Sequence, residues 1–128
     1  MKKQKSLPKL KAELQVLFNR FIVLRDKDKP CISCGKNNYL QAGHYFAVKG
    51  YDGLRFDEDN VHGECAGCNC FDESHLINYG ENLKDKIGLV RYNDLCRRAK
   101  LYKLSGYKWM RYEIEGMIDI YKSKIKND

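Results

Sequence analysis

The chain has 128 residues, with 24 Lys or Arg against 17 Asp or Glu, so its formal net charge is +7. A chain of this length fits one domain and is too short for two independent cores. It has no run of ~20 uncharged apolar residues, which argues against a membrane span, and its charged first residues predict no secretory signal. The basic excess favours a polyanionic partner such as nucleic acid, although such a charge can also serve solubility alone.

The first predicted element is an amphipathic helix over residues 7–25, after a basic tail. Ser6 is a suitable N-cap, and Pro8 is tolerated in the first turn. Because Pro30 disfavours helix at the residue before it, the helix is expected to end in the polar run before that proline. One apolar stripe recurs at helical spacing, and it contains Leu10, Leu14, Leu17, Phe18, Phe21 and Leu24.

The middle of the chain predicts short elements between two cysteine-rich turns. Short strands are expected over 39–45 and 54–56, followed by a polar turn at 57–60. These elements are too short to bury a core of their own, so a metal ion is expected to help stabilise them.

From Asn69 onward the spacing of apolar residues predicts helices. A first helix is indicated by apolar residues spaced four apart from Tyr79, and a second runs from Leu89 to about Lys100. Ser105-Gly106 breaks the pattern, and a long amphipathic helix is then expected from Tyr107 to near the end of the chain.

Four of the six cysteines form two matched Cys-x2-Cys turns, Cys31/Cys34 and Cys65/Cys68. Each such turn places two thiolates on one side of a tight loop, so two turns can close a tetrahedron around structural Zn²⁺. Redox pairs or unrelated buried thiols are the alternatives, but a redox Cys-x-x-C normally occurs once, near a βαβ pattern. A tetrathiolate is coordinatively closed and performs no catalysis.

Two further cysteines leave a choice open. Cys70 could compete with Cys68 as the fourth ligand, although Cys65/Cys68 repeats the spacing of the first pair. Cys70 and Cys96 are therefore expected to be ordinary thiols.

The order of residues around the two turns resembles the zinc-containing HNH (ββα-metal) nucleases, and more closely the phage NinG/Rap recombination endonuclease family. The resemblance covers about residues 10–90. The matching strings are Cys31-Ile32-Ser33-Cys34-Gly35, Gln41-Ala42-Gly43-His44-Tyr45, Leu54-Arg55-Phe56-Asp57, Asn60-Val61-His62 and Cys65-Ala66-Gly67-Cys68-Asn69.

The resemblance implies roles for three polar residues. His44 would be the general base, since a neutral imidazole can accept a proton near pH 7. Asn69 would be a ligand of a catalytic Mg²⁺ or Mn²⁺, which would relieve charge at the scissile phosphate and stabilise the leaving oxygen. Asn60 would brace the loop and orient the base; taken alone, it is a turn or cap residue.

One position departs from the family pattern, because Gly43 stands where many HNH nucleases have an Asp or His metal ligand before the base. His75 is the candidate replacement, with an exposed loop histidine as the ordinary interpretation and Asp72 and Glu73 as alternatives. His62 is a further candidate for the metal or for phosphate. Arg55, on the expected second strand, suits a charge-assisted phosphate contact.

The sequence therefore predicts an α+β fold in one domain over 1–128. A zinc-stapled, treble-clef-like ββα centre (31–75) lies between an N-terminal tail and helix (1–30) and a helical part (76–128). The implied function is metal-dependent cleavage of branched or recombination-intermediate DNA by a phage or prophage protein in the cytoplasm of a bacterial host. Cutting both strands of a junction would favour a homodimer. The alternative is a non-catalytic zinc-dependent module that binds DNA or protein.

Overall fold

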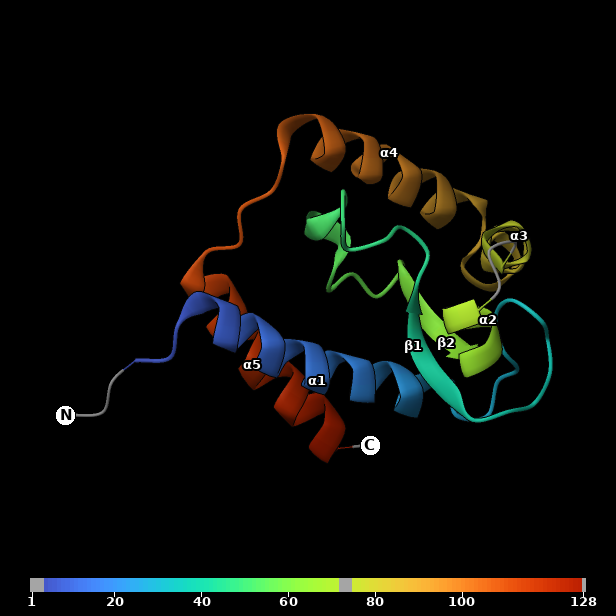
Figure 1. Ribbon diagram of the computed structural model, residues 1–128, viewed down its shortest axis with the longest axis horizontal. Coiled ribbons are helices and arrows are strands. Elements are labelled where there is room, and N and C mark those ends of the chain that lie inside the picture. The colour runs from blue at the N-terminus through green and yellow to red at the C-terminus, as the bar shows by residue number, and fades with distance from the viewer. Residues whose placement is uncertain (1–3, 72–74, 128) are drawn as a thin grey trace.

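The computed structural model describes residues 4–71 and 75–127. Figure 1 shows α1 and α5 along one side of the molecule, α4 along the opposite side, and the two strands between them. The fold is thus a mixed α+β arrangement, as the sequence predicts. Its elements in chain order are α1 (Leu7–Asp26), β1 (Leu40–His44), the 3-10 helix η1 (Asp52–Leu54), β2 (Val61–Cys65), α2 (Ala66–Phe71), α3 (His75–Ile87), α4 (Leu89–Ser105) and α5 (Arg111–Lys126).

Helix α1 begins where the sequence predicts and ends one residue later. The Ser6 hydroxyl accepts a hydrogen bond from the backbone N–H of Lys9 at 3.3 Å, which satisfies one of the free donors of the first turn. The side chains that α1 buries most deeply are spaced four residues apart, and they are Leu10, Leu14, Phe18 and Ile22. Leu17 and Phe21 flank this stripe and are partly buried.

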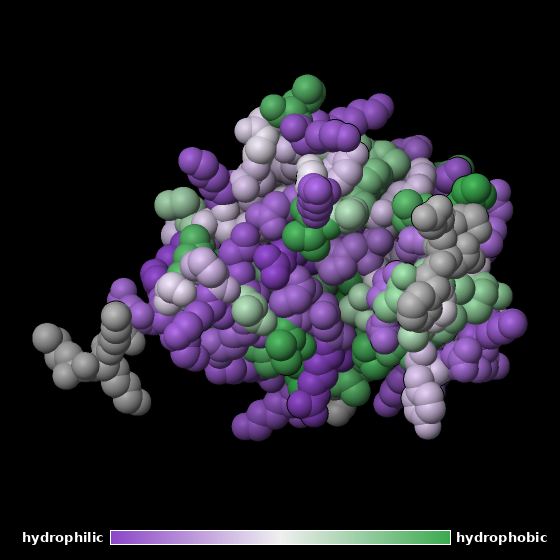
Figure 2. All heavy atoms as spheres, viewed as in Figure 1, coloured by the Kyte–Doolittle hydropathy of each residue, from purple (hydrophilic) through white to green (hydrophobic). Residues whose placement is uncertain are grey.

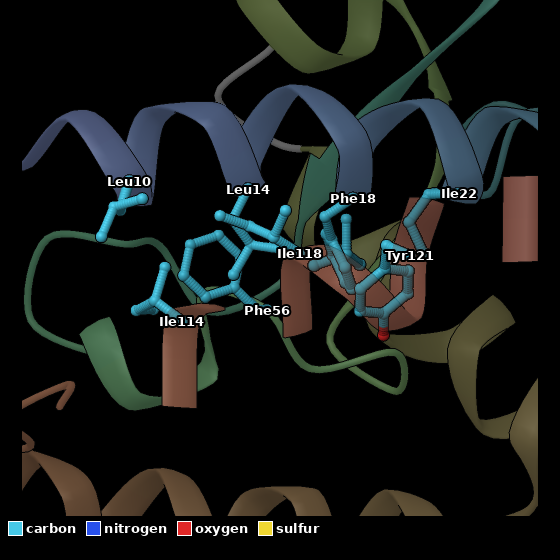
Figure 3. Close-up of a cluster of buried hydrophobic side chains, with 9 residues drawn as sticks. Leu10, Leu14, Phe18, Ile22, Phe56, Ile114, Ile118 and Tyr121 are labelled. Atoms are coloured by element: carbon cyan, nitrogen blue, oxygen red, sulfur yellow. The ribbon is translucent and has the colours of Figure 1, made fainter. Parts of the chain in front are cut away.

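The main apolar cluster lies between α1 and α5 and includes Phe56 from the connecting loop (Figure 3). The Phe18 ring packs edge-on against Tyr121 and against Phe56, with centroids 5.1 and 5.9 Å apart. Ile114 and Ile118 of α5 complete the cluster. Burying each large apolar side chain contributes ~1.5–3 kcal/mol, so this contact fixes α5 against α1.

The two strands form an antiparallel sheet whose register pairs Gln41 with Glu64 and Gly43 with His62. The first predicted strand is confirmed. The second is wrong, because residues 52–54 form a 3-10 turn and β1 pairs with Val61–Cys65 instead. Leu54 and Phe56 look like an alternating strand in sequence, but they enter two different apolar clusters.

The C-terminal helices differ from the prediction mainly at their ends. Helix α4 continues to Ser105, five residues further than expected, and α5 starts at Arg111 rather than at 107. Gly106 has a positive φ of 70°, which favours glycine and separates the two helices. The segment after it is not helical, and its Trp109 packs edge-on against Phe56, with 5.3 Å between ring centroids.

A second apolar cluster lies beneath α3 and α4 and contains Ile32, Leu54, Tyr79, Leu83, Leu95 and Ala99. The outer face seen in Figure 2 is mostly hydrophilic, with hydrophobic residues in separate small groups. Within the described ranges, no helix has the length and apolar character needed to cross a membrane.

Candidate functional site

Four cysteine sulfurs converge beside the sheet. Cys31 and Cys34 lie in the loop after α1, Cys65 ends β2, and Cys68 lies in α2. Their sulfur atoms all lie within 4.8 Å of one another, and those of Cys34 and Cys65 are 3.8 Å apart. A tetrahedron with Zn–S bonds of ~2.3 Å separates its sulfurs by ~3.8 Å. The cluster therefore fits a metal ion such as zinc.

Backbone groups hold this cluster in place. The N–H of Cys65 donates to the Cys31 sulfur at 3.3 Å, and the N–H of Ile32 donates to the Gly63 carbonyl at 3.0 Å. The exposed Cys70 lies outside the cluster, and its sulfur is 3.8 Å from Gln41 Oε1. The group of cysteines that fits a metal ion thus includes Cys68 and not Cys70.

His44 is the last residue of β1, and its ring is held by the backbone. Nε2 lies 2.9 Å from the carbonyl oxygen of Arg55, so this nitrogen must donate its proton. In the neutral ring Nδ1 is then the atom that can accept a proton. Burial is the main cause that lowers the pKa of His44 below its ordinary value of 6.5.

Asn60 is buried and ties together the two ends of the loop between the strands. Its Oδ1 accepts from the Phe46 N–H at 2.8 Å, and its Nδ2 donates to the carbonyls of Phe46 and Leu54 at 3.0 and 3.1 Å. These bonds join the two ends of the loop, which fits the bracing part of the role that the family resemblance implies for Asn60.

Glu64 is the site residue that sequence reasoning missed. Its side chain is fully buried on β2, and Oε2 accepts from the Ser33 hydroxyl and contacts His75 Nδ1 at 2.5 Å. Asn69, in α2, donates from Nδ2 to Gln41 Oε1 at 3.0 Å. The sequence offered no signal for Glu64, because no strand was expected at 61–65 and a fully buried Glu is uncommon.

His62 lies elsewhere than expected. It is 1% exposed, and its two ring nitrogens contact Arg25 Nη2 at 3.1 Å and the Asp59 carbonyl at 2.9 Å. Burial, reinforced by the positive charges of Lys86 and Arg25, lowers the pKa of His62 to about 3. Both ring nitrogens are engaged within the protein, so the expected metal or phosphate role of His62 does not fit this geometry.

Arg55 also differs from expectation, since it follows η1 and lies on no strand. Its Nε donates to Gln15 Oε1 at 2.6 Å, and its carbonyl holds His44. The contact of Arg55 that bears on the site is therefore made by its backbone carbonyl, which accepts from His44. The alternatives Asp72 and Glu73 lie outside the described residues.

Successive side chains of a strand point to opposite faces of the sheet, so the remaining candidate site residues lie on two different faces. Gly43 and Glu64 share the face that meets Asn69 and His75, whereas His44, the next residue, points to the other face. The structure thus brings Glu64, Asn69 and His75 around Gly43, while the His44 ring contacts the loop at Arg55.

Fold and site together define a small α+β domain built around a four-cysteine cluster. The family model described as Bacteriophage Lambda NinG protein matches residues 1–128, so the chain belongs to the NinG family. It is 33% identical over 117 residues to protein ninG of Salmonella phage P22, covering 90% of this chain and 55% of that protein. Protein ninG of Escherichia phage lambda is 32% identical over 117 residues, with coverage of 90% and 55%. The chain spans about half the length of these curated relatives, and no solved structure matches it.

Proposed function

We propose that this chain is a metal-dependent DNA endonuclease of the HNH type that acts on branched or recombination-intermediate DNA. The observation that carries the proposal is the His44 ring, whose Nε2 proton is engaged by the Arg55 carbonyl. Its lowered pKa keeps the ring neutral near pH 7, so Nδ1 can take a proton from an attacking water.

The other residues would supply the support for this base and the metal ion. Asn60 positions His44 by fixing the loop that carries the Arg55 carbonyl. Asn69 is the proposed ligand of Mg²⁺ or Mn²⁺, with His75 on the same side of the sheet and in contact with Glu64, and such an ion would supply charge relief at the phosphate and at the leaving 3′ oxygen. Zinc in the four-cysteine cluster would be structural, because a tetrathiolate has no open coordination position.

A groove beside Asn69 is the proposed path of a DNA strand. It has a volume of about 670 Å³ and runs between α1 and β1, where Asn19, Arg20 and Gln41 help to line it. Several other basic side chains are already engaged in ion pairs, including Lys11 with Asp52 at 3.1 Å. We therefore expect phosphate contacts from exposed cations such as Arg20 rather than from every lysine and arginine.

The biological setting is part of the same proposal. The implied place of action is the cytoplasm of a phage-infected or lysogenic bacterium. Paired cuts across a junction would need two active sites, which favours a homodimer on branched DNA.

The test is cleavage of plasmid and junction DNA by His44 variants in the presence of Mg²⁺ or Mn²⁺. His44→Ala should keep its zinc and its DNA affinity but cut ~10²–10⁴-fold more slowly. His44→Gln should be equally slow, because its amide can still donate to the Arg55 carbonyl but cannot accept the proton. Tyr39→Ala, a change at an exposed residue just before β1, is the control and should cut at the wild-type rate.

Two outcomes would contradict the proposal. Cleavage by His44→Ala at the wild-type rate would place the chemistry elsewhere. A wild-type protein that binds DNA or protein but cuts no DNA form would favour the non-catalytic zinc-dependent binding module.

A further inference from the structure

The buried face of the sheet holds a carboxylate oxygen that has no protein partner. Glu64 is 0% exposed, and its Oε2 is engaged by Ser33 and His75. Its Oε1 is also buried, and among the described residues nothing donates a hydrogen bond to it. Burying a carboxylate oxygen without a hydrogen-bond donor costs folding free energy. The unpaired oxygen therefore points to a ligand that is bound there.

This oxygen can lie close over β1 because residue 43 is glycine. A Cβ added at Gly43 would lie 2.3 Å from Glu64 Oε1 and 3.2 Å from Asn69 Oδ1. Gly43 does not have a positive φ, so its backbone conformation is open to any residue. The requirement for glycine is therefore one of space, because Glu64 Oε1 occupies the position where a Cβ of residue 43 would lie, with Asn69 Oδ1 next to it.

The neighbours of these oxygens leave them available for a cation. Asn69 uses its Nδ2 to donate to Gln41, which turns Oδ1 toward Gly43. His75 contacts the other oxygen of the carboxylate, Oε2, at 2.5 Å. Contacts of this kind orient ligating groups at metal sites.

We propose that Glu64 Oε1 and Asn69 Oδ1 bind one divalent cation of the Mg²⁺ or Mn²⁺ type over Gly43, with waters completing the coordination. Hard cations of this class prefer carboxylate and amide oxygens and retain several waters. His75 is then a positioning residue for Glu64. This inference deepens the proposed function, because β2 would supply the carboxylate that the nuclease pattern places before the general base. The cation site itself does not depend on the proposed function. Only the role of the ion in cleavage rests on that function.

Mn²⁺ is the probe, because it favours oxygen ligands and competes poorly with Zn²⁺ for thiolates. Titration of the zinc-loaded full chain, followed by the electron paramagnetic resonance signal of free Mn²⁺, should give one site per chain. Glu64→Gln, which keeps the shape of the side chain, should weaken binding at least tenfold. Glu81→Gln is the matched control, because it removes the same charge from an exposed position of α3 and should bind like wild type.

A second variant tests the position of the Glu64 carboxylate without replacing a ligand residue. Gly43→Ala should weaken Mn²⁺ binding because its methyl group would displace Glu64 Oε1 from its present position. Gly116→Ala, where an added Cβ meets nothing within 4 Å, is the matched control. Zinc content and circular dichroism confirm that each variant is folded, and Gly43→Ala decides the question if Glu64→Gln does not fold.

The outcomes separate this inference from the proposed function. Wild-type protein that binds no Mn²⁺, or folded Glu64→Gln and Gly43→Ala variants that bind it as tightly as wild type, would overturn the cation site. Mn²⁺ binding that depends on Glu64 in a protein that cleaves no DNA would support the site and contradict the nuclease.

Discussion

His44 is partly buried and His62 fully buried, both near the ends of paired strands, and their surroundings assign them different chemistry. His62 has both ring nitrogens engaged, by Arg25 and by the Asp59 carbonyl. His44 donates through Nε2 to Arg55, and its Nδ1 has no hydrogen-bond partner among the described residues. Of the two, only His44 has a nitrogen that can serve as a base.

The buried His62 should make the stability of the fold depend on pH. The unfolded chain takes up a proton at this residue near pH 6.5, whereas the folded chain does so only near pH 3. The free energy of unfolding should therefore fall as the pH drops from 6.5 toward 3, by up to about 1.4 kcal/mol per pH unit. Thermal denaturation at pH 7 and pH 5 measures this loss.

His62→Gln is the control, because its amide can still accept from Arg25 and donate to the Asp59 carbonyl but does not titrate. Arg25, Lys86 and Asp26 surround the ring and remain in both proteins. The pKa of Asp26 is held well below its usual range despite its burial, by Arg25 and Lys86, so its contribution is lost only below pH 3.8. If wild type and His62→Gln lose the same free energy of unfolding between pH 7 and pH 5, the result would argue against a neutral, buried His62.

At the scale of elements, the contact between α1 and α5 is the main apolar support of the fold. Phe18 is fully buried there and packs against Phe56 and Tyr121. Phe18→Ala should lower the free energy of unfolding by ~3–5 kcal/mol, because it removes the ring and leaves a cavity. Urea denaturation measures the change.

Val16→Ala provides the comparison on the same helix, since Val16 is 70% exposed. Its effect should stay within about 0.5 kcal/mol. A loss of similar size in the two variants would mean that α5 does not pack on the Phe18 face of α1.

At the scale of the whole molecule, the four-cysteine cluster joins the loop after α1 to the end of β2 and to α2. Cys34→Ser should lose the metal and unfold the centre, because binding of structural zinc contributes on the order of 10 kcal/mol. Cys70→Ser makes the same chemical change outside the cluster and should keep both the metal and the fold. Elemental analysis with far-ultraviolet circular dichroism measures both. Purified, reduced wild-type protein without stoichiometric zinc would contradict the prediction.

The net charge of +7 should make DNA affinity depend on salt. Log affinity should fall linearly with log salt concentration, with a slope of several units. Arg20→Ala, which removes an exposed cation beside the Asn69 groove, should reduce the slope by about 1. Lys124→Ala should change it less, because Glu58 already engages that lysine at 2.9 Å. Fluorescence anisotropy with labelled DNA gives the slopes, and salt-independent binding would rule out an electrostatic interface.

Local patterns in the sequence determined the features that depend on neighbours in the chain. Helix α1 follows from the N-cap at Ser6 and the apolar stripe, and β1 follows from a short run between turns. The four clustered cysteines follow from matched spacing, because a Cys-x2-Cys turn brings its own two sulfurs together. The NinG family likewise followed from short strings of residues.

Tertiary structure decided the features that depend on residues far apart in the chain. Leu54 and Phe56 turn to different apolar clusters, so their alternation did not make a strand. His62 became buried because Arg25 and Asp59 close around its ring. Glu64 could not be recognised from the sequence, because its surroundings are assembled from Ser33, Gly43 and His75. Only the pairing of β1 with β2 and the packing of α3 bring those groups to one carboxylate, and no local pattern encodes that contact.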